Sequence, residues 1–298
     1  MSSNPRLSLG PNLFYWSRDD IFDFYAEVAE MPVDIVYLGE TVCSKRRSLR
    51  TEDWFDLADR LSSAGKEVVL STLSLLEAES EMLTLRRLCE NGRFLVEAND
   101  MGAVQLLIKQ DVPFVTGPTV NIYNPATLQV LANKGLKRWV MPIELSKETL
   151  AEMQAKRPEG VETEIFAFGR MPLTLSARCF TARSHNLPKD DCQYKCLDYP
   201  DGRLLSTQEK KPFLALNGIQ TVSSLTCNLL PETAEMKRLD VDVLRISPQS
   251  QHTGRIVEAF HQALQDEPPP PLDRYVPLGT CDGYWHGGAG MERLKVKG

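Results

Sequence analysis

Three of the seven cysteines lie within one short stretch, ARCFTARSHNLPKDDCQYKC. Twelve residues separate Cys179 from Cys192, and three separate Cys192 from Cys196. Thiols that are grouped in this way indicate a metal or redox centre, because thiolate sulfur binds zinc and iron–sulfur clusters strongly. An odd number of cysteines in a chain of 298 residues also fits such a centre better than a disulfide framework.

The spacing alone leaves two kinds of metal centre open. Structural zinc usually shows closely spaced cysteine pairs on both sides of the site, and only Cys192 and Cys196 have this spacing. A four-iron four-sulfur cluster needs thiolates that converge from several directions, and their ligation can order a loop that lacks other structure. A radical enzyme that uses adenosylmethionine is excluded at this motif, since no CxxxCxxC run is present.

A fourth ligand is expected from another part of the chain. Cys43 follows the apolar segment VDIVYLGE at 33–40, which we predict to be the second strand of a parallel barrel. The cysteine loop follows the seventh predicted strand, so both loops leave the barrel at its C-terminal face, where barrel enzymes build their sites. The predicted ligands are Cys43, Cys179, Cys192 and Cys196. Cys89, Cys227 and Cys281 are expected to be small buried residues, with Cys227 as the reserve ligand.

The elements that would position these cysteines alternate regularly along the chain. Apolar segments rich in β-branched residues are followed by amphipathic stretches, which is typical of βα units and a parallel sheet. In TEDWFDLADRLSSAGK at 51–66, for example, apolar residues recur at three- and four-residue steps. Strands are predicted at 7–16, 33–40, 67–75, 94–100, 112–120, 136–145 and 162–169.

Residues 213–265 continue this alternation. Strands are predicted at 213–220 and 241–247, and helices at 230–239 and 254–265. The resulting count favours an α/β fold of the TIM-like (β/α)8 barrel type, with irregularity or incomplete closure allowed. An open doubly wound sheet is the alternative, because periodicity does not fix strand order, although no GxGxxG motif follows any strand.

The domain organisation follows from the same pattern. We predict a single barrel-like domain over 1–266, in which 170–212 is an irregular, cysteine-bearing insertion after strand seven. An insertion of this length needs something other than regular structure to order it. Residues 267–298 are predicted to be a proline-rich connector and a glycine-rich C-terminal tail.

Polar residues at the carboxyl ends of the predicted strands are candidates for substrate contacts. Arg170 and Arg178 flank the cysteine loop and are preferred, because a guanidinium group binds a carboxylate through two points. Glu97 and Glu144 are the further candidates, and Glu40, Asn99 and Asn121 lie at comparable positions. The catalytic residues themselves are not assigned.

Several segments together resemble one known family. These are SLGPNLFYW, YLGETVCSKR, FGRMPLTLSARCFTARSHNLPKDDCQYKCLDYPDG, LNGIQT and NLLPETAEMKRLDVDVLR, which extend over the length of the chain. They resemble the UbiV family of ubiquinone-biosynthesis accessory proteins, within the collagenase-like peptidase superfamily. The family's cluster ligands fall on the four cysteines already selected.

The resemblance implies a 4Fe-4S protein that pairs with a homologous UbiU-type partner as a heterodimer. Together they would support hydroxylation of the quinone-precursor ring in anaerobic ubiquinone biosynthesis. The hydroxyl oxygen would come from water or an organic donor such as prephenate. Two roles remain open for this chain, a catalytic subunit of an oxygen-independent hydroxylase or a non-catalytic partner subunit.

Two other activities within the superfamily are less favoured. A cysteine peptidase would need Cys179 and His185 as nucleophile and base, but ligation would remove the nucleophilicity of Cys179. No HExxH or GxSxG motif is present. An RNA base hydroxylase would use a basic surface such as Arg46, Arg47 and Arg50, but three arginines in SKRRSLR are more typical of a solvated turn.

Composition sets the remaining limits. The net charge of -6 gives no broad positive field for DNA or other nucleic acid. The apolar runs are shorter than the roughly 20 residues that a transmembrane helix requires, so no such segment is predicted. The N-terminal segment lacks the basic and apolar regions of a signal peptide, and a cytoplasmic location is therefore expected.

Overall fold

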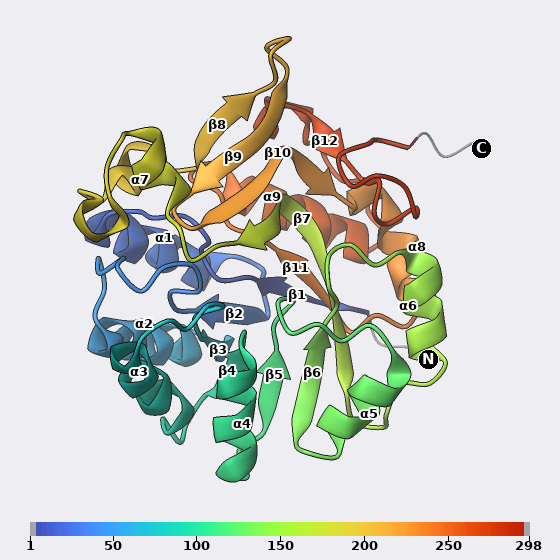
Figure 1. Ribbon diagram of the computed structural model, residues 1–298. Helices are drawn as coiled ribbons and strands as arrows, with labels where there is room; N and C mark the ends of the chain where they lie inside the picture. The colour runs from blue at the N-terminus through green and yellow to red at the C-terminus, as the bar shows by residue number, and fades with distance from the viewer. Residues whose placement is uncertain (1–3, 295–298) are drawn as a thin grey trace.

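The computed structural model describes residues 4–294, and its centre is a closed barrel of eight parallel strands (Figure 1). Each strand pairs in parallel with the next along the chain up to β7, and β11 closes the barrel between β7 and β1. The predicted TIM-like fold is therefore confirmed, and the open sheet is excluded. The barrel strands are β1 (Arg6–Leu9), β2 (Ile35–Leu38), β3 (Glu67–Ser71), β4 (Leu95–Ala98), β5 (Phe114–Thr116), β6 (Leu136–Val140), β7 (Glu162–Leu175) and β11 (Val243–Ile246).

Side chains alternate between the barrel lumen and the surrounding helices, as they must in a pleated strand. In β2, Ile35 and Tyr37 belong to a compact cluster inside the barrel, whereas Val36 and Leu38 pack in the larger outer core. This double burial explains why the strands are nearly continuous apolar runs. The helices of the outer layer are α1 (Arg18–Glu30), α2 (Thr51–Ser63), α3 (Glu79–Cys89), α4 (Met101–Lys109), α5 (Pro125–Ala132), α6 (Lys147–Gln154), α8 (Thr233–Arg238) and α9 (Thr253–Leu264).

Local sequence signals fix several helix starts. The side chains of Ser17, Asp100, Asn124 and Ser146 each accept a backbone N–H from the first turn of the helix that follows. In α5, Pro125 occupies the first turn, where the missing N–H costs nothing.

An insertion over 176–229 follows β7 and covers the C-terminal end of the barrel (Figure 1). β7 continues beyond the barrel to Leu175 and pairs there with β10, which forms an antiparallel hairpin with β9. The insertion contains α7 (Phe180–Ser184), η1 (Lys189–Asp191), η2 (Lys195–Asp198), β8 (Arg203–Ser206), β9 (Pro212–Asn217) and β10 (Gln220–Asn228).

Two expectations for this region are wrong. The segment 213–220 is not a barrel strand, because β9 and β10 run antiparallel and lie outside the closed ring. The region 170–212 is also less irregular than predicted, since it includes the end of β7 and all of β8. The eighth barrel strand is instead β11, within the strand predicted at 241–247.

The C-terminal segment returns to the body of the protein after η3 (Leu230–Glu232), β11 and α9. It forms η4 (Asp273–Tyr275) and β12 (Thr280–Cys281), which pairs in parallel with β10. Residues 295–298 of the predicted tail lie outside the described residues, and the predicted boundary at 267 stays a prediction.

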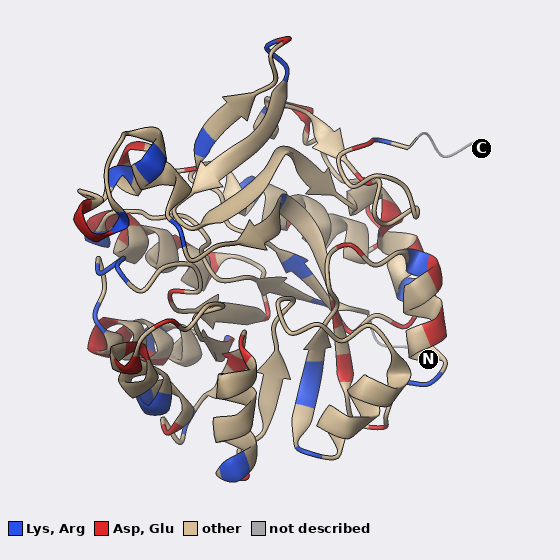
Figure 2. Cartoon of the chain, viewed as in Figure 1, with Lys and Arg blue, Asp and Glu red and all other residues tan. Residues whose placement is uncertain are grey.

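Charge and hydropathy agree with the expectations from composition. In the view of Figure 2, basic and acidic residues of the described chain alternate along the helices and loops. Within residues 4–294, no helix combines the length and apolar character that crossing a bilayer demands.

Candidate cysteine centre and barrel mouth

The four predicted ligands lie together above the C-terminal end of β2. Cys179, at the start of α7, is packed in a small buried cluster with Val42 and Ile219, and Cys43 and Cys192 pack against that cluster. The thiol of Cys179 interacts electrostatically with those of Cys43 and Cys192, and the thiol of Cys196 interacts with that of Cys179. Two segments that are distant in sequence therefore contribute to one group of thiols.

Direct contacts hold the two cysteine-bearing segments together. The Lys45 ammonium group donates to the Lys189 carbonyl oxygen at 3.1 Å and to Asp190 Oδ1 at 2.5 Å. Lys189 in turn donates to the Ala177 carbonyl oxygen at 2.8 Å and pairs with Glu77. These bonds join the loop after β2 to the insertion on one side of the thiol group.

A buried arginine lies on the other side. Arg46 is only 6% exposed and donates from Nη1 to the Leu13 carbonyl oxygen at 2.8 Å and from Nη2 to Asn217 Oδ1 at 2.6 Å. Burial alone would lower the pKa of Arg46, but Glu40 and the thiols of Cys196 and Cys43 lie beside it and raise this pKa. The expectation of a solvated turn is wrong for Arg46, whereas Arg47 and Arg50 are exposed.

The turn between β9 and β10 comes close to this arginine. Gly218 has φ of +69°, and a Cβ atom there would lie 3.0 Å from Arg46 Nη2 and 3.7 Å from Cys196 Sγ. Glycine therefore satisfies both the backbone conformation and the close approach. The segment predicted as a barrel strand at 213–220 therefore includes a turn that packs against the cysteine group.

The protein surroundings affect the protonation of the thiols. Burial raises the pKa of Cys43, Cys179 and Cys196. Hydrogen-bond donors oppose part of this effect, among them the Ala182 N–H, which lies 3.4 Å from Cys179 Sγ. Thiols that are buried together lose their protons most easily when a bound metal ion offsets the negative charge of the thiolates. N–H donors beside the sulfur atoms favour the same thiolate form, and this environment is therefore suited to a metal-containing group.

The spacing of the thiols bears on the kind of group. Thiolates around one tetrahedral zinc ion lie about 3.8 Å apart, because each Zn–S bond is about 2.3 Å long. In residues 4–294 no three His, Cys, Asp or Glu side chains are arranged to hold a single metal ion. A 4Fe-4S cluster differs from such a site, because its four cysteine thiolates bind four different iron atoms.

The remaining cysteines lie outside this group. Cys89, Cys227 and Cys281 are 1%, 6% and 1% exposed, which confirms the expectation of small buried residues. Cys227, the reserve ligand, is in register with Cys281 where β10 pairs with β12, and it therefore does not belong to the thiol group. Burial raises the pKa of Cys89 and Cys281 to about 12.

A second group of polar residues fills the barrel mouth. Arg245 on β11 donates from Nη1 to Glu97 Oε1 and from Nε to Glu164 Oε1, both at 2.7 Å. Its guanidinium carbon lies 4.1 Å from the centre of the Tyr37 ring. Glu97 also accepts hydrogen bonds from Ser71 and from Asn99, at 2.6 and 3.2 Å. Sequence analysis selected Glu97 and Asn99 but missed Arg245 and Glu164, which occupy ordinary strand positions.

This mouth contains unused hydrogen-bonding capacity. Arg245 Nη2 and Thr41 Oγ1 are buried without a hydrogen-bond partner among the described residues. Both residues line a cavity of about 40 Å³ beneath Pro11 and Pro172. A water molecule needs roughly 10–15 Å³ by a comparable measure, so the cavity accommodates a few waters or one small polar group.

Three predicted contact residues lie away from the mouth cavity. Glu144 bonds to Tyr123 beyond β6. Arg170 donates to the Asp201 carbonyl oxygen at 2.6 Å, and Arg178 is exposed on the insertion. The Nε2 atom of His185 is 3.1 Å from the Tyr199 hydroxyl.

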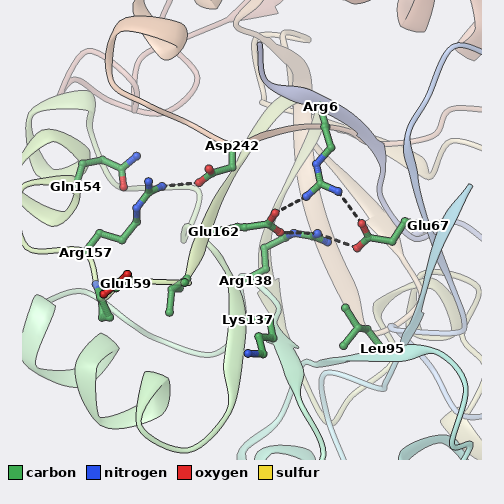
Figure 3. A pocket seen from close by; sticks show the side chains of 13 residues that line it. Arg6, Glu67, Leu95, Lys137, Arg138, Gln154, Arg157, Glu159, Glu162 and Asp242 are labelled. Carbon is green, nitrogen blue, oxygen red and sulfur yellow. Dashed lines mark hydrogen bonds and ion pairs between the residues drawn. The ribbon is translucent and has the colours of Figure 1, made fainter. Parts of the chain in front are cut away.

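A wider hollow lies at the opposite, N-terminal end of the barrel (Figure 3). Four of its charged side chains pair with one another: Arg6 bonds to Glu67 and Glu162, and Arg138 bonds to the same two carboxylates. At this end of a (β/α)8 barrel, polar residues normally serve stability. We therefore place the candidate site at the other end.

Fold and site define a (β/α)8 barrel protein with a thiol-rich insertion over its ligand-binding end. The family model for peptidase family U32 matches residues 23–267, and the chain belongs to this family.

Solved structures with similar folds include a U32 peptidase, at 12% identity and TM-score 0.48, with 84% of this chain and 96% of that chain covered. Dihydropteroate synthase from Thermus thermophilus is similar at 14% identity and TM-score 0.41, covering 88% and 93%. The corresponding enzyme from Stenotrophomonas maltophilia shows 11% identity and TM-score 0.45, covering 89% and 92%.

Proposed function

We propose that this protein binds a 4Fe-4S cluster through Cys43, Cys179, Cys192 and Cys196. The observation that carries the proposal is the assembly of these thiols from two distant segments beside the buried Arg46. A cluster of this kind supplies one-electron transfer when bound. The protein would contribute the four thiolates, the N–H donors at Cys179 and the positive charge of Arg46.

We further propose that the protein acts in anaerobic ubiquinone biosynthesis together with a UbiU-type partner. This part of the proposal is supported by the sequence resemblance and by membership of the U32 family. The chain would support ring hydroxylation of the quinone precursor with an organic oxygen donor such as prephenate. The mouth, with Arg245 and Asn99, lies at the barrel end where substrates of this fold bind.

Anaerobic purification followed by iron and sulfide analysis tests the cluster. We expect about four iron and four sulfide ions per chain. Cys192→Ser should lower the iron content and weaken the visible absorption of the cluster. Cys89→Ala is the matched control, because Cys89 is buried outside the thiol group. A protein that binds one zinc ion and no sulfide would overturn the cluster assignment.

The choice between a catalytic and a supporting subunit needs a second experiment. Arg178→Ala changes an exposed residue of the insertion, and cluster content should stay normal. If this chain carries a substrate contact there, anaerobic quinone formation by the pair should fall while heterodimer formation persists. Unchanged quinone formation would favour a supporting role, and failure of the two chains to associate would contradict the proposed partnership.

A further inference from the structure

A separate cavity lies beside the cysteine group, between the starts of α2 and α3. Its volume is about 370 Å³, within the range of small-molecule sites. The loops after β2 and β3 form one wall, α2 contributes its first turn, and α3 lines the cavity from Ser80 to Leu88. Neither the thiol group nor the barrel-mouth cavity contains these helix residues.

Much of the lining is apolar and incompletely covered. Leu49 and Leu85 are buried at the floor, whereas Trp54, Leu73 and Leu76 remain half-buried around it. Half-buried large side chains around one hollow retain apolar area that a ligand would remove from water. The groove therefore suits a molecule with an apolar body.

The carboxylates that line the groove have hydrogen-bond or ion-pair partners within the protein. Glu40 accepts the N–H groups of Val42 and Cys43, and Glu81 accepts those of Glu77 and Ala78 at the start of α3. Glu52 forms an ion pair with Arg87. These carboxylates are therefore all occupied by donors of the protein itself.

Two basic residues at the rim differ from them. Arg47 and Arg50 are exposed and line the groove, and no side-chain hydrogen bond or ion pair of either is found within residues 4–294. Arg50 does interact electrostatically with Glu52 and Asp53 and helps to lower the pKa of both carboxyl groups. The N-termini of α2 and α3 are already occupied, because Asp53 and Glu81 accept backbone N–H groups there. The cations that a ligand can reach in the groove are thus the two arginines at its rim.

We propose that this groove binds an amphipathic organic carboxylate, with the apolar body against Trp54, Leu73 and Leu76 and the carboxylate at Arg47 and Arg50. Guanidinium groups recognise carboxylates through charge-assisted, two-point hydrogen bonds. Since Ser44 and Arg46 also line the groove, a bound molecule would lie next to the cysteine group. The proposal does not depend on the iron–sulfur cluster.

Isothermal titration of the purified protein with naphthoate tests this site. We expect saturable binding of naphthoate, and binding at least tenfold weaker for neutral naphthamide and for acetate, which has no apolar body. The combined change Arg47→Gln and Arg50→Gln should weaken naphthoate binding roughly tenfold. Arg86→Gln is the control, because Arg86 lies on α3 outside the groove.

A steric variant provides an independent test. Thr84 is exposed and lines the groove, so Thr84→Trp should obstruct it and weaken binding on the order of tenfold or more. The neighbouring Leu83 is 58% exposed and outside the lining, so Leu83→Trp should bind normally. Equal affinities for naphthoate and naphthamide, or full binding by Thr84→Trp, would overturn the proposal. Iron content is measured in the same samples, so failure here is distinguishable from failure of the cluster.

Discussion

At the scale of single residues, the barrel lumen depends on a buried network of charges. Glu164 accepts from Arg245 at 2.7 Å and from Ser8 at 2.6 Å, and it also bonds to the Tyr37 hydroxyl. Burial alone would raise the pKa of Glu164, but Arg245 and Arg138 beside it lower this pKa. The charged carboxylate is therefore the form that the folded state prefers.

The pH dependence of stability follows from this shift. A carboxyl group whose pKa is lowered by folding stabilises the folded protein at any pH above the pKa it has in the unfolded chain, about 4.5 for glutamate. This stabilisation is lost as the pH falls through the pKa of the folded state. Glu164→Gln should lower the free energy of unfolding by about 3–5 kcal/mol at pH 7, since it leaves buried arginines undercompensated. The difference from the wild-type protein should shrink below pH 4.5 in urea denaturation. Exposed Glu159→Gln should show neither effect, and a pH-independent difference would contradict the assigned cause.

Single residues were predictable from sequence where their type is rare. Four cysteines in two loops stood out, and the structure brings them together. Arg245 and Glu164 were not predictable, because one charged residue in a strand carries no signal of whether it faces the lumen or a helix. The burial of Arg46 depends on Leu13 and Asn217, which are distant in sequence.

At the scale of elements, the barrel strands were predicted because each is an apolar run followed by a helix. The end of β7 was placed too early, since Pro172 is unusual inside a strand. In the structure Pro172 sits at a register irregularity in the pairing with β10, where its missing N–H is tolerated. Periodicity also does not show in which direction a strand runs. The strand predicted at 213–220 was therefore counted in the barrel, although β9 pairs antiparallel with β10 outside it.

Tight contact between strand ends makes one glycine critical. Gly39 directly follows β2 with φ of +138°, and a Cβ atom there would lie 2.4 Å from the Ser71 carbonyl oxygen. Gly39→Ala should therefore lower the free energy of unfolding by about 3 kcal/mol or more, through backbone strain and displacement of β3. Urea denaturation measures this loss.

Gly65→Ala is the matched control for that measurement. Gly65 also has a positive φ, of +84°, but a Cβ atom there would have no neighbour within 4 Å. The free energy of unfolding of Gly65→Ala should fall by only about 1–2 kcal/mol, because only the backbone conformation becomes unfavourable. Similar losses in the two variants would show that the close approach to β3 has no energetic effect.

At the scale of the whole molecule, the C-terminal segment is part of the folded body. Trp285 is 3% exposed and donates from Nε1 to Glu232 Oε2 at 3.0 Å, and its carbonyl oxygen accepts from Lys147. Composition pointed only to a connector and a glycine-rich tail, because packing of a short segment against distant elements leaves no periodic signal. The barrel, the insertion and this segment share one sheet system.

Loss of that packing should affect global stability. We expect Trp285→Ala to lower the free energy of unfolding by about 3–5 kcal/mol, the usual cost of deleting a large buried aromatic side chain. Phe213→Ala, at a position 48% exposed, should change it by no more than about 0.5 kcal/mol. The measurement is urea denaturation followed by far-ultraviolet circular dichroism. A loss for Trp285→Ala as small as that for Phe213→Ala would show that the segment is only loosely attached.

The pairing of β1 with β11 has a consequence for synthesis on the ribosome. Arg6 is in register with Val243, so the first strand of the ring cannot complete its pairing until the last one has been synthesised. During translation β1 keeps one edge unpaired while well over two hundred residues are added. Long-range closure of this kind is slow and exposes an aggregation-prone edge. The nascent chain should therefore depend on chaperones until β11 has emerged from the exit tunnel.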